Sequence, residues 1–185
     1  MINEIYKRLK TIPSRRDIHI LLDEFKFKIF CEIGVRIGEN LLDMLKANPT
    51  EMVAVDLWRE DGVRTRNDLS YSQKELDSQF QYIQSLQVQY PAIKIIRNYS
   101  TEAAKQFADG YFDYVYIDAD HTYEAVRDDI KAWYPKVRQY GILGGHDYHP
   151  NAPTCTVNMA VDEFVRQNSL LFHSEISNSW YVVKP

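Results

Sequence analysis

Apolar residues follow two patterns along the chain, short continuous runs and recurrences every three or four residues. Continuous runs are typical of strands buried on both faces of a sheet, and the wider spacing is typical of helices with one buried face. Strands are predicted at 28–33, 51–58, 93–97, 111–117 and 141–148. Helices are predicted between and after them, at 41–45, 72–90, 101–108, 123–137 and 157–165. This alternation predicts one α/β, doubly wound sheet with helices on both faces.

Two short helical patterns precede the first strand, and two strand patterns close the chain. The apolar faces of the first two helices comprise Ile2, Ile5, Tyr6 and Leu9, then Ile18, Leu21, Leu22 and Phe25. Ser14 and Ser100 are candidate helix caps, and Ser72 with Glu75 forms a capping-box pattern. The N-terminal helices are expected to pack on the sheet or cover a ligand cleft. The runs at 170–173 and 180–183 predict a hairpin-like pair of strands.

Polar residues gather where the fourth and fifth strands end. Asp118, Asp120 and His121 directly follow the fourth strand, and Asp147 ends the fifth. Ligands of open α/β sheets bind outside the carboxyl ends of the strands, so these side chains lie where chemistry is expected. If the two strands are neighbours, Asp118 and Asp147 repel each other unless a cation lies between them. A hard divalent ion, Mg²⁺ or Mn²⁺, would suit these oxygen ligands.

The first strand ends in a glycine turn, and the second ends in an acid. Gly34 and Gly38 can allow a tight turn and a close approach of the next helix to a ligand. Asp56 follows Glu32 by 24 residues (56 − 32), close to the offset at which an acid binds a ribose. The combination predicts a nucleoside-containing cofactor. An ordinary strand-to-helix turn, with Asp56 as a cap, is the alternative.

Composition limits the class of protein. The chain has 185 residues, 45% of them hydrophobic, which predicts one domain over 1–185 with N-terminal helices at 1–27 and a core at 28–185. A net charge of −4 gives no overall electrostatic footprint for nucleic acid or an anionic membrane. The first residues lack the apolar core of a signal peptide, no run of 18 apolar residues exists, and two cysteines show no metal-ligand spacing. A cytoplasmic protein with free thiols is expected.

Four motifs together resemble class I S-adenosylmethionine-dependent methyltransferases, and most closely the small O-methyltransferases of sugars and glycosylated natural products, the macrocin type. They are Glu32-Ile33-Gly34-Val35-Arg36-Ile37-Gly38, Val55-Asp56-Leu57-Trp58, the block from Phe112 to Glu124, and Gly141-Ile142-Leu143-Gly144-Gly145-His146-Asp147-Tyr148. The resemblance implies a Rossmann-like, mostly parallel seven-stranded sheet of order 3-2-1-4-5-7-6, with the last strand antiparallel. It also implies S-adenosylmethionine as the cofactor and a small acceptor, a sugar above all, as the partner; self-association into a homodimer stays open.

The resemblance also implies roles for the matched residues of the cofactor side. Glu32, Gly34 and Gly38 would contact the methionine portion of S-adenosylmethionine. Asp56 would bind the ribose, and Ser100 would approach the adenine. Arg36 interrupts the usual alternation of glycines in the first turn, so the backbone contacts there are expected to differ in detail.

On the acceptor side the resemblance implies a catalytic group and a metal site. Asp118 would be both a catalytic residue and a cofactor-binding residue. Together with Asp147 it would hold a divalent ion. His121 or Asp120 would act as general base. Tyr148 stands where metal-using relatives often carry a second acid or amide, so His146, Asp120 or water is the third ligand, or the site works without metal. Each residue also has a purely structural alternative. Asp118 and Asp120 could be helix caps, His121 could be a structural histidine, and Asp147 could be a turn residue.

Two other activities remain open from the sequence. A metal-dependent hydrolase would use the acids and histidines of 118–121 and 146–147, but it leaves the glycine turn and Asp56 without a purpose. A nucleoside-binding protein or nicotinamide oxidoreductase on the same fold would not explain the acidic end of the fourth strand. Residues 58–71 form either a binding loop or lid, or a solvated loop of mixed charge.

Overall fold

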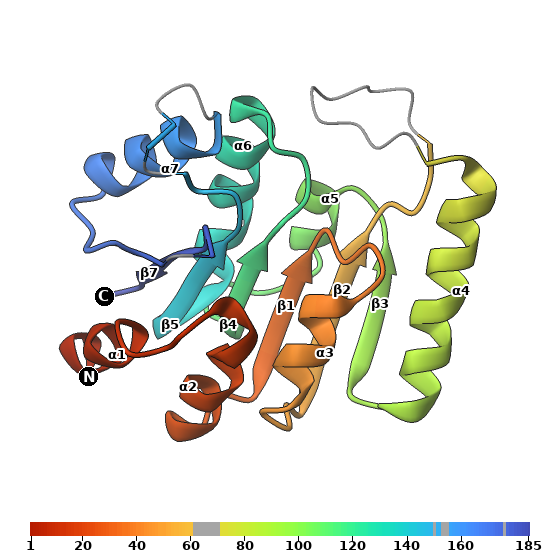
Figure 1. Cartoon of the computed structure of the whole chain (residues 1–185), viewed down its shortest axis with the longest axis horizontal. Helices are drawn as coiled ribbons and strands as arrows, with labels where there is room; N and C mark the ends of the chain where they lie inside the picture. The colour runs from red at the N-terminus through yellow and green to blue at the C-terminus, as the bar shows by residue number, and fades with distance from the viewer. Residues whose placement is uncertain (61–70, 150, 153–155, 176) are drawn as a thin grey trace.

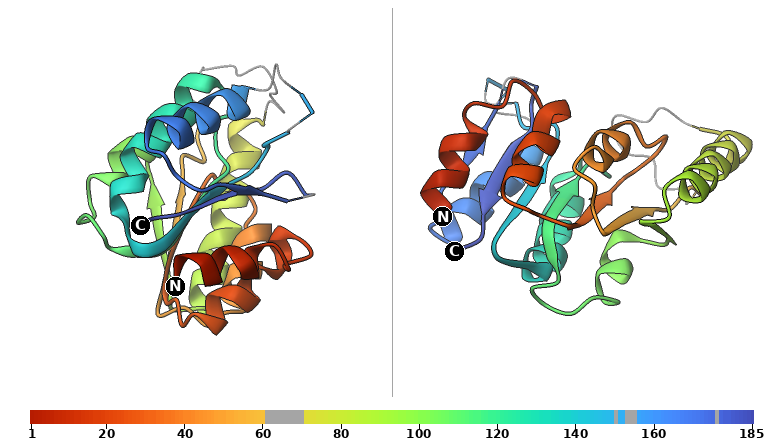
Figure 2. Two further views of the ribbon diagram at one scale, coloured as in Figure 1. Left: turned by 90° about the vertical axis from the view of Figure 1, so that its left-hand side faces the viewer. Right: turned by 90° about the horizontal axis from the view of Figure 1, so that it is seen from below.

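A seven-stranded sheet forms the centre of the molecule, with helices on both faces (Figures 1 and 2). The computed structural model describes residues 1–60, 71–149, 151–152, 156–175 and 177–185. The strand order is β3-β2-β1-β4-β5-β7-β6, and β7 runs antiparallel to both of its neighbours, which confirms the predicted topology. The strands are β1 (Ile29–Ile33), β2 (Glu51–Asp56), β3 (Ile93–Arg97), β4 (Phe112–Ile117), β5 (Val137–Gly145), β6 (His173–Ser174) and β7 (Trp180–Val183).

The helices divide between the two faces of the sheet because side chains alternate along each strand. One core contains Phe30, Met52 and Tyr114, and the opposite core contains Cys31, Val53 and Val115. The first core is covered by α1 (Ile2–Leu9), α2 (Ile18–Glu24), α3 (Glu39–Leu45) and α4 (Gln73–Gln89). The second is covered by α5 (Ser100–Ala104), α6 (Tyr123–Trp133) and α7 (Thr156–Gln167). Two short 3₁₀ helices, η1 (Arg15–Asp17) and η2 (Tyr134–Lys136), join neighbouring elements.

Several local predictions are corrected by the structure. Residue Val137, predicted in the helix after β4, opens β5, because Pro135 cannot continue the α-helix and η2 follows α6. Ser100 is the first helical residue of α5 and not its cap. Ser14 precedes η1, and its hydroxyl donates to the Asp17 carboxylate in place of capping the backbone. The strand predicted at 170–173 is limited to His173–Ser174.

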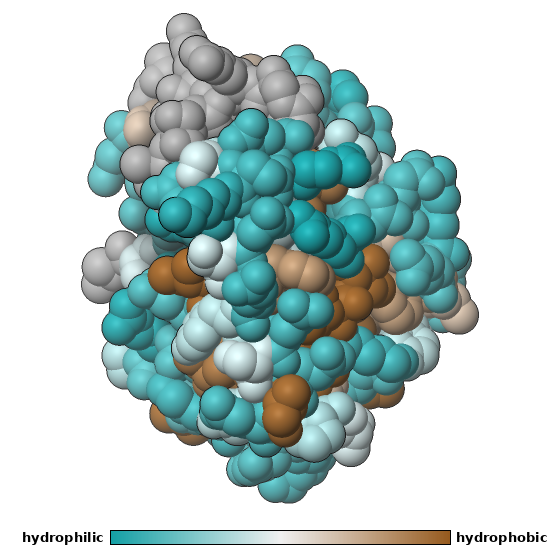
Figure 3. Space-filling view, turned by 90° about the vertical axis from the view of Figure 1, so that its right-hand side faces the viewer, coloured by the Kyte–Doolittle hydropathy of each residue, from teal (hydrophilic) through white to brown (hydrophobic). Residues whose placement is uncertain are grey.

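The edge strand β3 and the long helix α4 form one side of the molecule. Ser72 and Glu75 make the predicted capping box at the start of α4. This side is mostly hydrophilic, with apolar atoms gathered near its middle (Figure 3). On β3, Lys94 is exposed and pairs with Glu51 of β2 at 3.0 Å. A charged edge discourages pairing with strands of other molecules. Most of the predicted loop 58–71 lies outside the described residues.

The carboxylate of Asp113 links the amino ends of the central strands. It accepts hydrogen bonds from the amides of Lys28 and Ile29 at 2.6 and 2.8 Å and pairs with Arg138 of β5. A buried carboxylate with these partners stabilises the sheet, because the two amides would otherwise lose their acceptor. No helix of the described residues combines the length and the apolarity needed to cross a membrane.

We expect Asp113→Ala to lower the free energy of unfolding by about 2–4 kcal/mol, because two amides and a guanidinium lose a common acceptor. Asp128→Ala is the control, since Asp128 is exposed and pairs with the adjacent Arg127, and it should change stability by less than about 0.5 kcal/mol. Chemical denaturation measures both values. Equal losses in the two variants would contradict this account of the sheet.

Candidate active site

The predicted polar residues meet at the carboxyl ends of β4 and β5. β4 pairs with β5 in parallel, and Ile117 lies opposite Gly145, so the residues that follow the two strands emerge side by side. Asp118, His121 and Asp147 each offer a ligand atom within 4.8 Å of the others. The sequence-based inference that Asp147 lies near Asp118 is therefore confirmed.

The ring of His121 lies between the two carboxylates. Its Nδ1 is 3.0 Å from Asp147 Oδ2, and its Nε2 is 3.4 Å from Asp118 Oδ1. The contacts with Asp118 and then with Asp147 raise the pKa of His121 to about 10. The raised pKa favours a protonated ring, and the 3.0 Å contact with Asp147 favours it as well. As a general base it would first have to lose that proton.

Asp147 lies among histidines. Besides His121, His146 Nδ1 is 3.1 Å from its Oδ1, and His149 Nε2 is 3.6 Å from the same oxygen. Hydrogen bonds from His121 and His146 hold the pKa of the Asp147 carboxyl well below its usual range. His146 is oriented in turn by the backbone oxygen of Ser177, 3.1 Å from Nε2. Asp147 is consequently ionised. Its backbone lies in the left-handed region, with a φ of +56°.

Arg15 joins the site from the N-terminal segment, and no pattern in the sequence predicts it. Its Nη1 lies 3.1 Å from Asp118 Oδ2 across 103 residues of sequence. Arg15 and Asp118 are each 22% exposed, so water screens the pair only in part. A contact between such distant segments leaves no periodic or spacing pattern that sequence reasoning could use.

The donor atoms of Asp118, Asp147 and His121 suit Mg²⁺ or, with an imidazole included, Mn²⁺. The charge of the cluster, however, is already balanced by side chains. Arg15 contacts Asp118, and a protonated His121 contacts both acids. A divalent ion at this place would have to displace the proton of His121. The metal stays a prediction.

Asp120 lies apart from this cluster. Its Oδ1 accepts a hydrogen bond from the amide of Thr122 at 2.8 Å, at the entrance to α6. Thr122 is the N-cap of α6, and its hydroxyl accepts from the amide of Ala125 at 3.4 Å. The contacts that the structure shows for Asp120 are those of a structural residue in the turn before a helix.

Glu32 is the most buried acid of the site, with 2% of its surface exposed. Asn40 of α3 donates to its Oε1 at 3.0 Å, while Oε2 has no hydrogen-bond partner among the described residues. Burial raises the pKa of Glu32 to about 8. A buried acceptor without a partner costs folding free energy, and a cationic ligand would satisfy it.

The glycine turn places Glu32 and Asp118 next to each other. Gly34 has a φ of +87°, and a Cβ there would lie 2.1 Å from the carbonyl oxygen of Asp118. Gly38 has a φ of +77° and packs against Ile83 of α4, whose Cδ1 would be 2.8 Å from an added Cβ. Gly34 is therefore required by the protein's own packing, and glycine at position 38 is favoured by its left-handed backbone, beyond any contact with a ligand.

Asp56 and Ser100 have partners inside the protein. The two oxygens of Asp56 accept from the amides of Arg36 at 2.7 Å and Trp58 at 3.0 Å. The Ser100 hydroxyl accepts from Trp133 Nε1 at 2.8 Å. The ribose and adenine assignments stay predictions.

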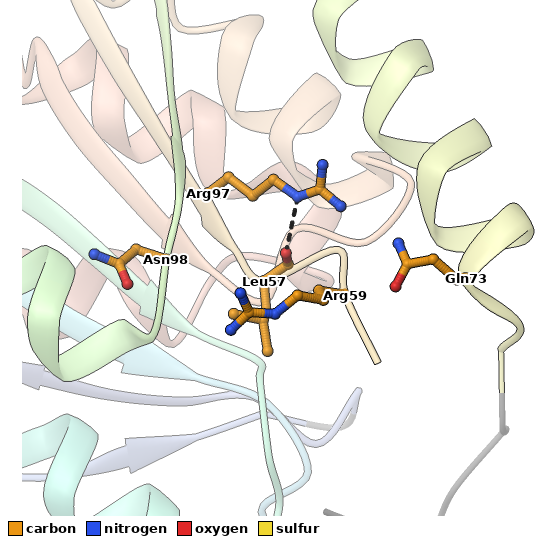
Figure 4. Close-up of a pocket in the computed structure, with 5 residues that line it drawn as sticks. All are labelled: Leu57, Arg59, Gln73, Arg97 and Asn98. Carbon is orange, nitrogen blue, oxygen red and sulfur yellow. Dashed lines mark hydrogen bonds between the residues drawn. The ribbon is translucent and has the colours of Figure 1, made fainter. Parts of the chain in front are cut away.

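A cavity of about 460 Å³ opens beside Asp56, at the ends of β2 and β3. In the middle of Figure 4 is Leu57, which lines the cavity, with Asn98 after β3 on one side of it and Gln73 at the start of α4 on the other. Arg97 crosses above Leu57, and its Nε donates to the Leu57 carbonyl at 3.2 Å, while Arg59 extends beside the same residue. The sequence did not single out this cavity, since it depends on how α4 returns to the sheet.

Comparisons with known proteins agree on the type of domain. A family described as a methyltransferase domain matches residues 31–148. A search of curated proteins finds no match to this chain. Among solved structures, a Staphylococcus aureus protein described as a caffeoyl-CoA O-methyltransferase is 14% identical, covers 97% of this chain and 89% of its own, and has a TM-score of 0.67.

Two further structures have the same fold. The O-methyltransferase NovP is 16% identical over 96% of this chain and 79% of its own, with a TM-score of 0.66. An O-methyltransferase from Bacillus cereus, in complex with SAH (S-adenosylhomocysteine), is 12% identical over 99% of this chain and 90% of its own, with a TM-score of 0.60. At these identities the likeness establishes the fold.

We expect Gly34→Ala to lower the free energy of unfolding by more than about 3 kcal/mol, because the added methyl group meets the Asp118 backbone. Gly110→Ala is the matched control: its φ is +71°, but the nearest atom to an added Cβ is 3.8 Å away. It should cost only about 1–2 kcal/mol, the strain of a left-handed alanine. Chemical denaturation of both variants makes the measurement, and a Gly34→Ala protein as stable as Gly110→Ala would contradict the close approach.

Proposed function

The chain belongs to the methyltransferase-domain family that matches residues 31–148, and from this premise we propose that it methylates a hydroxyl group of a small acceptor. It is a class I S-adenosylmethionine-dependent methyltransferase. This membership favours methyl transfer over the hydrolase and oxidoreductase alternatives. For the choice of oxygen as the acceptor atom, support comes from the acid–imidazole cluster and from neighbours described as O-methyltransferases.

The observation that carries the proposal is the buried, unpartnered Oε2 of Glu32 beside the Gly34 turn. S-adenosylmethionine has an ammonium group on its methionine portion, and a charge-assisted hydrogen bond to Oε2 would satisfy both groups. Asp56 follows on the next strand as the proposed ribose ligand. Since the cavity at Leu57 directly follows Asp56, we propose that it receives the adenine base.

The acceptor would bind over Asp118, His121 and Asp147. The cofactor supplies a sulfonium methyl group that is already activated, so the protein's tasks are to align the acceptor hydroxyl and to remove its proton. Asp118 is joined to the glycine turn through its amide, which donates to the Ile33 carbonyl at 2.7 Å. The carboxylate is thereby close to both halves of the reaction. A sugar hydroxyl is the acceptor that the motif resemblance suggests.

Binding of S-adenosylhomocysteine to the purified protein tests the proposal first. We expect calorimetry to show binding to the wild type, because the cofactor residues do not depend on the acceptor. With S-adenosylmethionine and a panel of sugars, phenols and amines, we expect transfer to a hydroxyl and its loss in Asp118→Ala. Absence of binding to the wild type would sink the proposal. Transfer to amines alone would contradict the choice of acceptor atom.

Glu32 also makes stability depend on pH. Its pKa is about 8 in the folded chain against an ordinary 4.5, so between these values the unfolded chain releases a proton that the folded chain keeps. The stabilisation is complete below about pH 4.5 and is lost as the pH rises to about 8. We expect Glu32→Gln to be more stable than wild type by about 1 kcal/mol or more at pH 8, with no difference near pH 4.

The same variant should bind the cofactor product at least about tenfold more weakly, because an amide replaces a charge-assisted acceptor. Glu39→Gln, an exposed change of equal charge in the first turn of α3, is the control. Denaturation at several pH values and calorimetry with S-adenosylhomocysteine measure the two effects. A Glu32→Gln protein that loses stability and keeps its affinity would contradict the assigned role.

A further inference from the structure

Arg15 lies outside the stretch that the family matches, and several segments hold it over the active site. The turn η1 contacts α2 and α3, the helix that follows the glycine turn. The Arg15 amide donates to the Ser177 hydroxyl at 3.4 Å, so the C-terminal segment also fixes its position. Within the turn, the Ser14 hydroxyl bonds the Asp17 carboxylate at 2.9 Å. Several segments consequently restrict the position of Arg15 over the site.

The two oxygens of Asp118 have different partners. Oδ2 is 3.1 Å from Arg15 Nη1, and Oδ1 is 3.4 Å from His121 Nε2. An arginine hydrogen bond on one oxygen restricts rotation of the carboxylate. Arg15 thereby directs Oδ1 of Asp118 toward His121 and Asp147.

Asp118 has an arginine among its partners as well as histidines. His121 and His146 lie within 3.8 Å of both acids, and His149 lies 3.6 Å from Asp147. Arg15 remains charged at every pH at which the protein is folded. It supplies Asp118 with a permanent positive charge at a distance of 3.1 Å.

We propose that Arg15 is the resident counter-cation of Asp118 and a positioning residue of the methyl transfer. It balances the charge that a divalent ion would otherwise balance, and it leaves only Oδ1 to face the cluster. This inference rests on the proposed role of Asp118, His121 and Asp147 as the reaction site. Because like charges repel in a site that is only partly open to water, the guanidinium opposes the binding of a divalent ion.

Titration with MnCl₂ by calorimetry, with and without S-adenosylhomocysteine, tests the role of Arg15. We expect Arg15→Met to bind Mn²⁺ at least about tenfold more tightly than the wild type, because the repulsion is removed. Arg16→Met is the matched control: Arg16 is the adjacent, exposed arginine, and its removal changes the net charge equally. It should leave Mn²⁺ affinity unchanged. An unchanged or weaker affinity in Arg15→Met would overturn the inference, as would an equal gain in Arg16→Met.

Two more variants separate charge from fold. Arg15→Lys keeps the positive charge and should retain the wild-type affinity for Mn²⁺, whereas Arg15→Gln keeps a hydrogen-bond donor without the charge and should gain affinity. Thermal melting establishes that each variant is folded. If neither Arg15→Met nor Arg15→Gln folds, the role of Arg15 is structural and the inference is wrong. Binding of S-adenosylhomocysteine to the wild type is read separately, so failure of the proposed function is distinguished from failure of this inference.

Discussion

The contact between the Gly34 turn and the backbone of Asp118 is the constraint on which the site depends. β1 and β4 are neighbours, and the Asp118 amide donates to Ile33 while its carbonyl fills the space that a side chain at Gly34 would need. Residues that end the two strands therefore cannot move independently. Glu32, which we propose binds the cofactor, and Asp118, which we propose faces the acceptor, are held in one geometry by the backbone itself. Catalysis by orientation requires a rigid link of this kind.

Charge is the second constraint, and it is met locally. Parallel pairing of β4 and β5 brings Asp118 and Asp147 together, and side chains from three parts of the chain surround them: Arg15, His121, and His146 with His149. The protein has in this way balanced two acids without leaving either one buried and alone. Glu32 is the contrast, because one of its oxygens lacks a partner among the described residues. Stability is lower there than it could be, which is typical of positions reserved for a ligand.

The doubly wound sheet and the meeting of Asp118 with Asp147 were predictable from periodicity and from the topology of strand–helix units, whereas the full strand order was what the motif resemblance implied. The end of α6 was not predictable, since the pattern that continued to Val137 suits a helix and a buried strand equally. The role of Asp120 was ambiguous for a similar reason: an acid after a strand has the same sequence whether it serves chemistry or a turn, and in the structure it accepts from the Thr122 amide. Arg15 could not be found at all, because its partner lies 103 residues away and no local rule connects them.

The supply of site residues is divided along the chain. Glu32, Asp56, Asp118 and Asp147 lie inside the stretch that the family shares, whereas Arg15 and Ser177 reach the same site from outside it. The residues from outside the family match can therefore change while those inside it stay the same. Substitutions in the terminal segments offer a route to new acceptors that leaves the chemistry of the inherited core in place.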